Sequence, residues 1–234
     1  MANVPGVSII LPAFRLGPVI AANAARVARS CGDLDAQIIV VDDGSDDDTF
    51  QQAMQAAKEV EGLEVIRHPR NLGKGEALVS GWKAAGADRI VFLDGDLDLP
   101  PEQIPEVLTE LERSDVVVGA KRRTMQSGGY PLLRRMMSRL YAEGTSRLFG
   151  LPVHETQTGL KAFRREVLDD ILPRVGMRGW AFDLELLVRA FRSGYTMSET
   201  PVTVSISDKG APVRPSMIWA LARDSVKLAW KLRH

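Results

Sequence analysis

The sequence predicts an α/β fold built on a mostly parallel sheet. In the first half of the chain, five short apolar runs rich in β-branched residues alternate with stretches of helical composition. Runs that are apolar throughout are typical of strands covered on both faces, and strand–helix alternation favours parallel pairing with right-handed crossovers. The expected strands are residues 7–11, 38–41, 63–66, 90–93 and 116–118, and the expected helices are residues 17–30, 47–61, 74–86 and 101–113.

The second half of the chain has a different character. Residues 116–142 contain six Lys or Arg side chains and no Asp or Glu. Further helices are expected at residues 131–149, 164–172 and 181–193, followed by a strand at residues 200–206.

The last twenty residues, from Pro215, predict an amphipathic helix. Its apolar side chains, Trp230 among them, fill a broad arc at 100° per residue. The basic stripe on the opposite side consists of Arg223, Lys227, Lys231 and His234. Such a helix either lies among lipid headgroups or packs on the core of its own domain. We therefore divide the chain into an α/β domain, residues 1–213, and this helix, residues 214–234.

Composition limits the partners and the compartment. The 234 residues include 30 Lys and Arg and 30 Asp and Glu, so no net charge favours nucleic acid, and we expect no nucleic-acid partner. Cys31 is the single cysteine, which excludes an intramolecular disulfide and favours a reducing compartment. The N-terminus resembles no signal peptide, and no apolar run reaches the roughly 18–20 residues of a membrane helix. We expect a cytoplasmic protein, peripheral on a membrane at most.

Asp94, Asp96 and Asp98 lie at alternate positions directly after an expected strand. Three such carboxylates repel one another unless a cation lies among them, and their hard oxygens suit Mg²⁺ or Mn²⁺. Gly95 leaves room for a ligand to approach the backbone. The alternative is an acidic loop that caps the helix beginning near Pro100. We favour the metal because the motif follows a buried strand.

Two further motifs follow expected strands. Asp42 and Asp43 end the second strand, where a carboxylate can accept from a base N–H or a ribose hydroxyl. The acidic residues 46–48 are expected mainly to cap the next helix. Lys74, flanked by glycines at the start of a helix, can offer a cation and backbone N–H groups to a diphosphate.

The ordered set of motifs resembles family 2 glycosyltransferases with the GT-A fold, in particular the polyprenyl-phosphate (dolichyl-phosphate) mannosyl- and glucosyltransferases. The resemblance covers nearly the whole chain. Its motifs, in order, are VSIILPAF, IIVVDDGSDD, HPRNLGKGEAL, FLDGDLDLPPE, ETQTGLKAFRREVL and GWAFDLELLVRA. The sequence departs from the family at Arg15 and Leu16, where relatives have Asn and Glu.

The resemblance implies roles for individual residues. The donor nucleotide would lie against Pro12, Ala13, Phe14, Asp42, Asp43, Lys74, Asp94, Gly95 and Asp96. The metal and the catalytic carboxylates would be Asp94, Asp96 and Asp98. The acceptor phosphate would be held by Lys121, Arg122, Arg134 and Ser138. The sugar side of the cleft would include Thr156, Gln157, Thr158, Asp183 and Glu185.

The resemblance therefore implies an inverting, metal-dependent hexosyltransferase. It would move a sugar from UDP-glucose or GDP-mannose to a polyprenyl phosphate on the cytoplasmic face of a membrane. A separate membrane-anchoring subunit or a second copy of the chain in a homo-oligomer is the expected protein partner. Three alternatives stay open: a family 2 enzyme with a soluble sugar or glycan acceptor, a non-catalytic nucleotide-sugar-binding protein, and a nucleotidyltransferase. The last needs a glycine-rich phosphate loop after the first strand, and residues 12–17 make a poor one.

Overall fold

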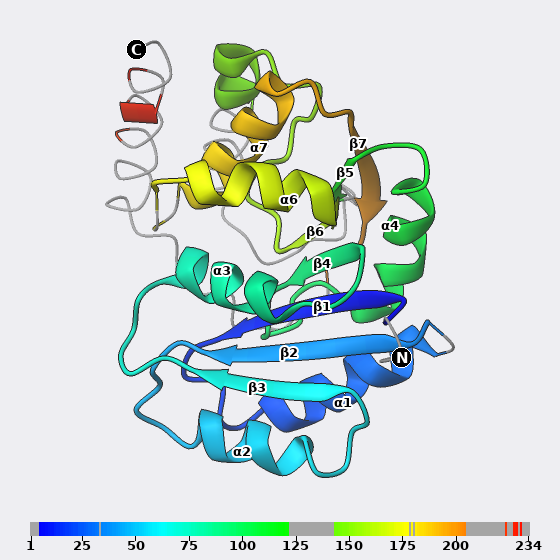
Figure 1. The fold of residues 1–234 in the computed structure, drawn as a ribbon, viewed down its shortest axis with the longest axis vertical. Coiled ribbons are helices and arrows are strands. Elements are labelled where there is room, and N and C mark those ends of the chain that lie inside the picture. Colours follow the sequence, from blue (N-terminus) through cyan, green and yellow to red (C-terminus); the bar gives the residue numbers. More distant parts are fainter. Residues whose placement is uncertain are drawn as a thin grey trace.

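The computed structural model describes residues 5–32, 34–121, 143–177, 179, 181–204, 223, 227, 228 and 230. These residues form one seven-stranded sheet with helices on both faces (Figure 1). The strands are β1 Val7–Ala13, β2 Ala36–Asp42, β3 Leu63–Arg67, β4 Arg89–Leu93, β5 Val116–Lys121, β6 Leu160–Arg164 and β7 Met197–Val202. The helices are α1 Ile20–Cys31, α2 Thr49–Ala56, α3 Lys74–Ala84, α4 Ile104–Glu110, α6 Arg165–Ile171 and α7 Phe182–Arg192, with 3₁₀ turns at Pro101–Gln103 and Leu172–Arg174.

The sheet has the strand order β3-β2-β1-β4-β6-β5-β7. The pairs β2–β3, β1–β2, β1–β4 and β5–β7 are parallel, whereas β6 runs antiparallel to both β4 and β5. The predicted mostly parallel sheet is therefore confirmed, and all five strands expected in the first half are present.

Two elements differ from the prediction. Strand β6 was not expected, because Lys161 interrupts its short apolar pattern. Strand β7 begins at Met197 and ends at Val202, earlier than the expected range of 200–206. Of the helix expected at residues 131–149, residues 143–149 are helical, and the rest lies outside the described residues.

The central strand β1 shows why its sequence is apolar throughout. Ile9 and Leu11 pack into the core beneath α1, α2 and α4, whereas Ile10 packs into the core beneath α3, α6 and α7. Each of these side chains is fully buried. Because both faces of the sheet are covered, alternate positions cannot be polar, and the strand lacks the alternation of a half-exposed one.

Four residues near the C-terminus have a described environment. Leu228 is fully buried in the core that contains α6 and α7, while Arg223 and Lys227 are exposed. Trp230, which was placed on the apolar arc, is 70% exposed. These residues lie at helical backbone positions, but the predicted helix 214–234 otherwise falls outside the described residues. In the described part of the chain, no helix is long and apolar enough to cross a membrane.

Candidate active site

Three of the predicted motifs meet at the carboxyl edge of the sheet. Ala13 at the end of β1 pairs in register with Asp42 at the end of β2. The Gly95 N–H, just after β4, donates to the Pro12 carbonyl (3.3 Å), and the Asp43 N–H donates to the Ala13 carbonyl (2.8 Å). Parallel strands end together, so residues far apart in sequence gather here, as expected for a ligand site in an open α/β sheet.

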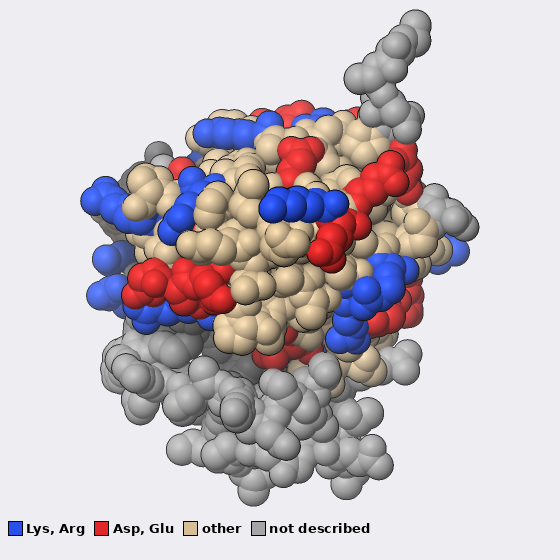
Figure 2. All heavy atoms as spheres, turned by 90° about the horizontal axis from the view of Figure 1, so that it is seen from below, with Lys and Arg blue, Asp and Glu red and all other residues tan. Residues whose placement is uncertain are grey.

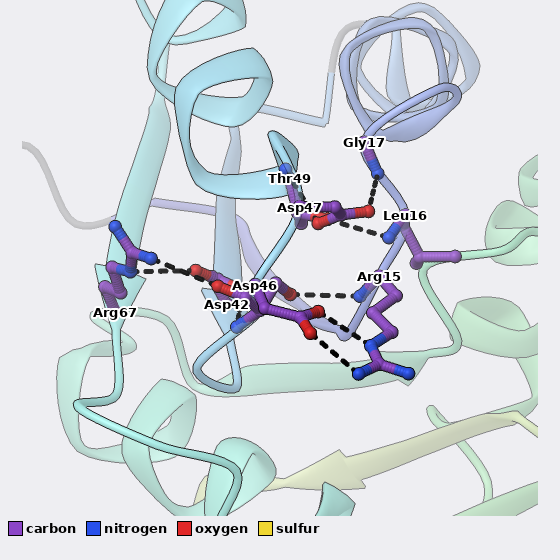
Figure 3. A network of polar contacts seen from close by, with 9 residues as sticks. Arg15, Leu16, Gly17, Asp42, Asp46, Asp47, Thr49 and Arg67 are labelled. Carbon is purple, nitrogen blue, oxygen red and sulfur yellow. Dashed lines mark hydrogen bonds and ion pairs between the residues drawn. The ribbon is translucent and has the colours of Figure 1, made fainter.

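A polar network locks the β1–α1 loop to the β2–α2 loop (Figure 3). The Arg15 guanidinium forms a bidentate ion pair with Asp46 (2.7 and 2.8 Å), and its backbone N–H donates to Ser45 Oγ. The Gly17 N–H donates to Asp47, which also accepts from the backbone N–H of Thr49. Of the acidic residues 46–48, Asp47 accepts from the N–H of Thr49, the first residue of α2, whereas Asp48 at the N-cap position makes no capping side-chain hydrogen bond. Asp46 and Asp47 together join the loops. Arg15, a departure from the family pattern, is part of this lock.

Asp42 and Asp43 are both buried, and both bind the protein itself. Asp42 accepts from the Ser45 N–H and lies 3.2 Å from Arg67 Nε. Asp43 accepts from the backbone N–H groups of Leu72 and Gly73 at 2.9 and 2.8 Å. Asp43 thus fixes the loop that leads into α3.

His68 and the neighbouring surface complete this side of the site. His68 Nδ1 lies 2.8 Å from Asp43 Oδ1 and Nε2 lies 2.8 Å from Ser80 Oγ, so the ring supports Asp43. Phe14 is partly exposed, with the Arg15 guanidinium 5.2 Å from its ring centroid. A hollow of about 420 Å³ lies next to these loops and is lined by Gly44, Ser45, Arg67, His68 and Pro69.

Lys74, the first residue of α3, points to the acidic segment, residues 94–98. Its Nζ lies 2.5 Å from Asp94 Oδ1 and 3.9 Å from Asp183 Oδ2. Burial lowers the pKa of Lys74, but the two carboxylates outweigh that effect and raise it above its ordinary value. The predicted cation and the predicted carboxylates are therefore brought together.

Asp183 is held from beneath by a residue that sequence reasoning missed. Lys161 on β6 is only 1% exposed, donates to the Thr158 carbonyl at 2.5 Å and lies 2.7 Å from Asp183 Oδ1. Burial penalises the Asp183 carboxylate, but Lys161 and Lys74 together lower its pKa. The available signal was a lysine inside an otherwise apolar strand, because such a charge is seldom buried without a partner.

The acidic segment turns so that its members face different surroundings. Leu97 is buried at φ 52°, and Asp96 and Asp98 on either side of it are exposed. The pKa of Asp96 is raised, first by loss of water around the carboxylate and then by the charge of Asp94. Bringing a cation close would relieve this repulsion.

The expected set of three metal ligands is not preformed. Within the described ranges, no three His, Cys, Asp or Glu side chains are grouped so as to hold a metal ion. Lys74 in addition occupies Asp94. Mg²⁺ is commonly bound through one or two carboxylates plus substrate phosphates, and the exposed Asp96 and Asp98 suit that arrangement. The residues fit a metal that binds to these carboxylates and gains further ligands from a diphosphate.

The loop 156–159 lies against Asp94. The Gly159 carbonyl accepts from the Asp94 N–H at 3.0 Å, and a Cβ on Gly159 would lie 2.2 Å from Asp94 Oδ2. Thr156 Oγ1, Gln157 Nε2 and Thr158 Oγ1 are buried without a hydrogen-bond partner in the structure as described. Buried polar atoms of this kind usually have partners, so they are candidates for contact with a bound sugar.

Glu185, predicted on the sugar side of the cleft, has a supporting role instead, and Lys121 is the one predicted acceptor residue that lies in the described part of the chain. Glu185 is fully buried and accepts from the Gly176 and Met177 N–H groups, with Arg189 Nε at 2.8 Å, so it fixes the loop before α7. Lys121 is exposed at the end of β5. The other predicted acceptor residues, Arg122, Arg134 and Ser138, lie outside the described residues.

The protein thus belongs to the class of open α/β sheets that place loops with charged side chains at the carboxyl edge, where such folds bind ligands. The sequence profile of glycosyl transferase family 2 matches residues 8–172. The chain therefore belongs to this family, as the resemblance predicted.

Curated relatives agree with the family. Glycosyltransferase AglD of Haloferax volcanii is 32% identical over 84% of this chain and 32% of its own length. Undecaprenyl-phosphate 4-deoxy-4-formamido-L-arabinose transferases from Aeromonas hydrophila and Pseudomonas fluorescens are 30% and 33% identical over 71% of this chain, and over 51% and 49% of their own lengths. The chain thus spans between about a third and a half of these relatives.

Solved structures confirm the GT-A fold. Glucosyl-3-phosphoglycerate synthase from Mycobacterium tuberculosis, in complex with UDP, is 22% identical with a TM-score of 0.73, covering 97% of this chain and 79% of that chain. Its complex with Mn²⁺, UDP and glucosyl-3-phosphoglycerate gives a TM-score of 0.74 at 23% identity, covering 96% of this chain and 78% of that one. At this identity the likeness concerns the fold.

Proposed function

We propose that this chain is the catalytic part of a metal-dependent, inverting hexosyltransferase that uses UDP-glucose or GDP-mannose and a polyprenyl phosphate acceptor. The observation that carries the proposal is the position of Lys74, which contacts Asp94 beside the exposed Asp96 where β1, β2 and β4 end. A cation facing a pair of carboxylates there suits a diphosphate bound with a metal. The names of the undecaprenyl-phosphate relatives support the lipid acceptor.

The donor nucleotide would bind along residues 12–14, with Phe14 offering an exposed ring face to the base. Asp43 acts through the Leu72–Gly73 backbone that it holds, and so sets where Lys74 begins α3. Asp42 shapes the neighbouring loop through Ser45. Lys74 would then exchange part of its contact with Asp94 for the donor diphosphate.

Asp96 and Asp98 would hold the metal together with the diphosphate, next to Asp94. A divalent ion bound there supplies charge stabilisation for the departing nucleoside diphosphate. The buried hydroxyls of Thr156 and Thr158 would face the sugar across Asp94.

The acceptor phosphate would approach from the side of Lys121, with Arg122, Arg134 and Ser138 as further ligands. A phosphate monoester is already ionised near pH 7, so its oxygen can attack the anomeric carbon without a general base. Attack from the face opposite the leaving diphosphate inverts the configuration.

The exposed residues near the C-terminus suit contact with a membrane surface. Leu228 anchors the C-terminal residues in the core, while Arg223, Lys227 and Trp230 are exposed, as a surface facing anionic lipid requires. Figure 2 views the molecule from below, the end that carries α2 in Figure 1, and shows Lys and Arg intermingled with Asp and Glu over the described part of that end. We place the protein at the cytoplasmic side of a membrane, with residues 214–234 facing lipid and an anchoring subunit or second copy as possible partners.

A donor screen tests the function. UDP-glucose, GDP-mannose and UDP-GlcNAc are each supplied with Mn²⁺ or Mg²⁺ and a polyprenyl phosphate, and the lipid fraction is analysed by mass spectrometry. We expect one glycosyl-phospholipid, lost with EDTA. Donor hydrolysis without any lipid product would reject the lipid acceptor.

A soluble phosphorylated acceptor is the second candidate. It is favoured by the fold likeness to a synthase solved with phosphoglyceric acid. Supplying phosphoglyceric acid in place of the polyprenyl phosphate separates the two, because a lipid-specific enzyme forms no product from it. Lys121→Ala should raise the KM for the lipid acceptor about tenfold, whereas a soluble sugar acceptor predicts little change.

A further inference from the structure

Four charged side chains form a chain of alternating sign that runs from a buried strand into the candidate site. Lys161 from β6 contacts Asp183 from α7 at 2.7 Å. Asp183 lies 3.9 Å from Lys74 of α3, and Lys74 lies 2.5 Å from Asp94 at the end of β4. Each inner member therefore divides its attraction between two partners of opposite charge.

Lys161 has no direct access to a ligand. Its side chain is 1% exposed and belongs to β6, a strand paired on both sides by β4 and β5. Burying an ammonium group costs free energy that a single ion pair often fails to recover, and here burial lowers the pKa of Lys161 in spite of Asp183. Any influence of Lys161 on the cleft has to pass through the groups it touches, Asp183 and the Thr158 carbonyl.

We infer that Lys74 competes with a divalent cation for Asp94, and that the buried Lys161–Asp183 pair sets the strength of this competition. With Lys161 close to it, Asp183 attracts Lys74 only weakly, as the distance of 3.9 Å indicates. Lys74 therefore stays on Asp94 at 2.5 Å and partly cancels the charge that a cation needs. Lys161 is a positioning residue that acts through Asp183.

The charges give the two buried residues opposite effects. Without Lys161, Asp183 draws Lys74 away from Asp94, which leaves Asp94 to the cation. Without the charge of Asp183, Lys74 pairs with Asp94 alone, and the cation binds Asp94 less tightly. A purely structural role for the pair predicts instead that both changes damage the site in the same direction. This inference takes its relevance from the proposed metal-dependent function, but its test requires no turnover.

The test is a Mn²⁺ titration of the full chain without nucleotide, with free Mn²⁺ measured by electron paramagnetic resonance. Removing the competitor, Lys74→Met, should tighten Mn²⁺ binding about tenfold. Lys161→Met should tighten it about threefold and Asp183→Asn should weaken it about threefold. The matched control is Lys83→Met, which removes an exposed lysine from the same helix and should change the affinity less than about twofold.

Combined variants test the route of the effect. In a Lys74→Met background, Lys161→Met and Asp183→Asn should each leave the Mn²⁺ affinity unchanged, because the competitor is absent. The double variant Lys161→Met, Asp183→Asn should bind Mn²⁺ with the affinity of Asp183→Asn alone. If Lys161→Met folds poorly because it leaves the Asp183 carboxylate buried without its lysine, this double variant avoids that problem.

Three results would overturn the inference. They are shifts of the same sign for Lys161→Met and Asp183→Asn, effects that persist without Lys74, and a Lys74→Met protein that binds Mn²⁺ no better than the wild type. A negative donor screen would reject the proposed function and leave this titration interpretable. The two failures are therefore distinguishable.

Discussion

Asp43 at the start of the β2–α2 loop accepts a hydrogen bond of 2.8 Å from the backbone N–H of Gly73, thirty residues further along the chain. The same carboxylate accepts from the Leu72 N–H at 2.9 Å. Because Gly73 immediately precedes α3, this bond sets where Lys74 enters the site. Asp43 resembles a nucleotide ligand in the sequence. In the structure it supports the loop before Lys74, the residue that faces the carboxylates of Asp94 and Asp183.

Asp43→Asn should therefore affect stability and donor binding together. One oxygen becomes an amide that donates, and a buried N–H loses its acceptor, at a cost of about 1–3 kcal/mol in the free energy of unfolding. We expect a lower urea midpoint and weaker binding of UDP with Mn²⁺ by calorimetry. Asp46→Asn is the control, because its pair with Arg15 is exposed to solvent and should contribute little to stability. Equal losses for the two variants would contradict this account of Asp43.

Gly159→Ala should fold and yet lose activity. The new Cβ would overlap Oδ2 and Cγ of Asp94 and come within 3.0 Å of its Cβ, so the whole Asp94 side chain has to turn away from this loop. We expect kcat to fall about tenfold or more with a melting temperature close to that of the wild type. Gly144→Ala provides the comparison, because a Cβ there meets nothing within 4 Å. If Gly159→Ala keeps full turnover, the position of the Asp94 carboxylate is not important for catalysis.

Asp96→Asn should abolish metal-dependent turnover. The exposed carboxylate is the one proposed to bind metal with the diphosphate, and the change removes its charge but keeps its shape. We expect kcat to drop about a hundredfold or more, measured with the donor found in the screen and saturating Mn²⁺. Asp88→Asn, just before the opposite end of β4, should retain activity. A similar loss in both variants would point to general damage.

Cys31 should resist thiol reagents while the protein is folded. The side chain is 3% exposed, and burial raises its pKa to about 11. An aromatic disulfide reagent at pH 8 should therefore react with the native protein far more slowly than with the protein in urea. Rapid reaction in the native state would show that this part of α1 opens readily.

The raised pKa of Cys31 also makes the free energy of unfolding depend on pH. The folded state keeps the thiol protonated at pH values where the unfolded thiol ionises. This contribution is fully present below the ordinary thiol pKa and is lost as pH rises from there toward about 11. A Cys31→Ala variant, compared by urea titration at pH 7 and pH 10, isolates this contribution from other groups.

The α/β class follows from the amino-acid pattern alone, because continuous apolar runs such as residues 7–11 are required where both faces of a strand are covered. The pattern also puts Asp42, Asp43 and Asp94 at the ends of strands, and so at one edge of the sheet. These are local patterns, and local propensity and periodicity are sufficient to read them.

Only the tertiary structure decided which charges meet. Nothing in the spacing of Lys74, Asp94, Lys161 and Asp183 shows that they form one chain of contacts, because the partners belong to four different elements. Lys161 breaks the apolar pattern of the short strand β6, so the sequence did not indicate this strand. Only the pairing of β6 with β4 and β5 brings Lys161 to its partner Asp183. Likewise, Glu185 looks like a site residue in sequence but is turned inward to the loop before α7. Side-chain direction and long-range pairing depend on the packed fold, and the sequence pattern does not contain them.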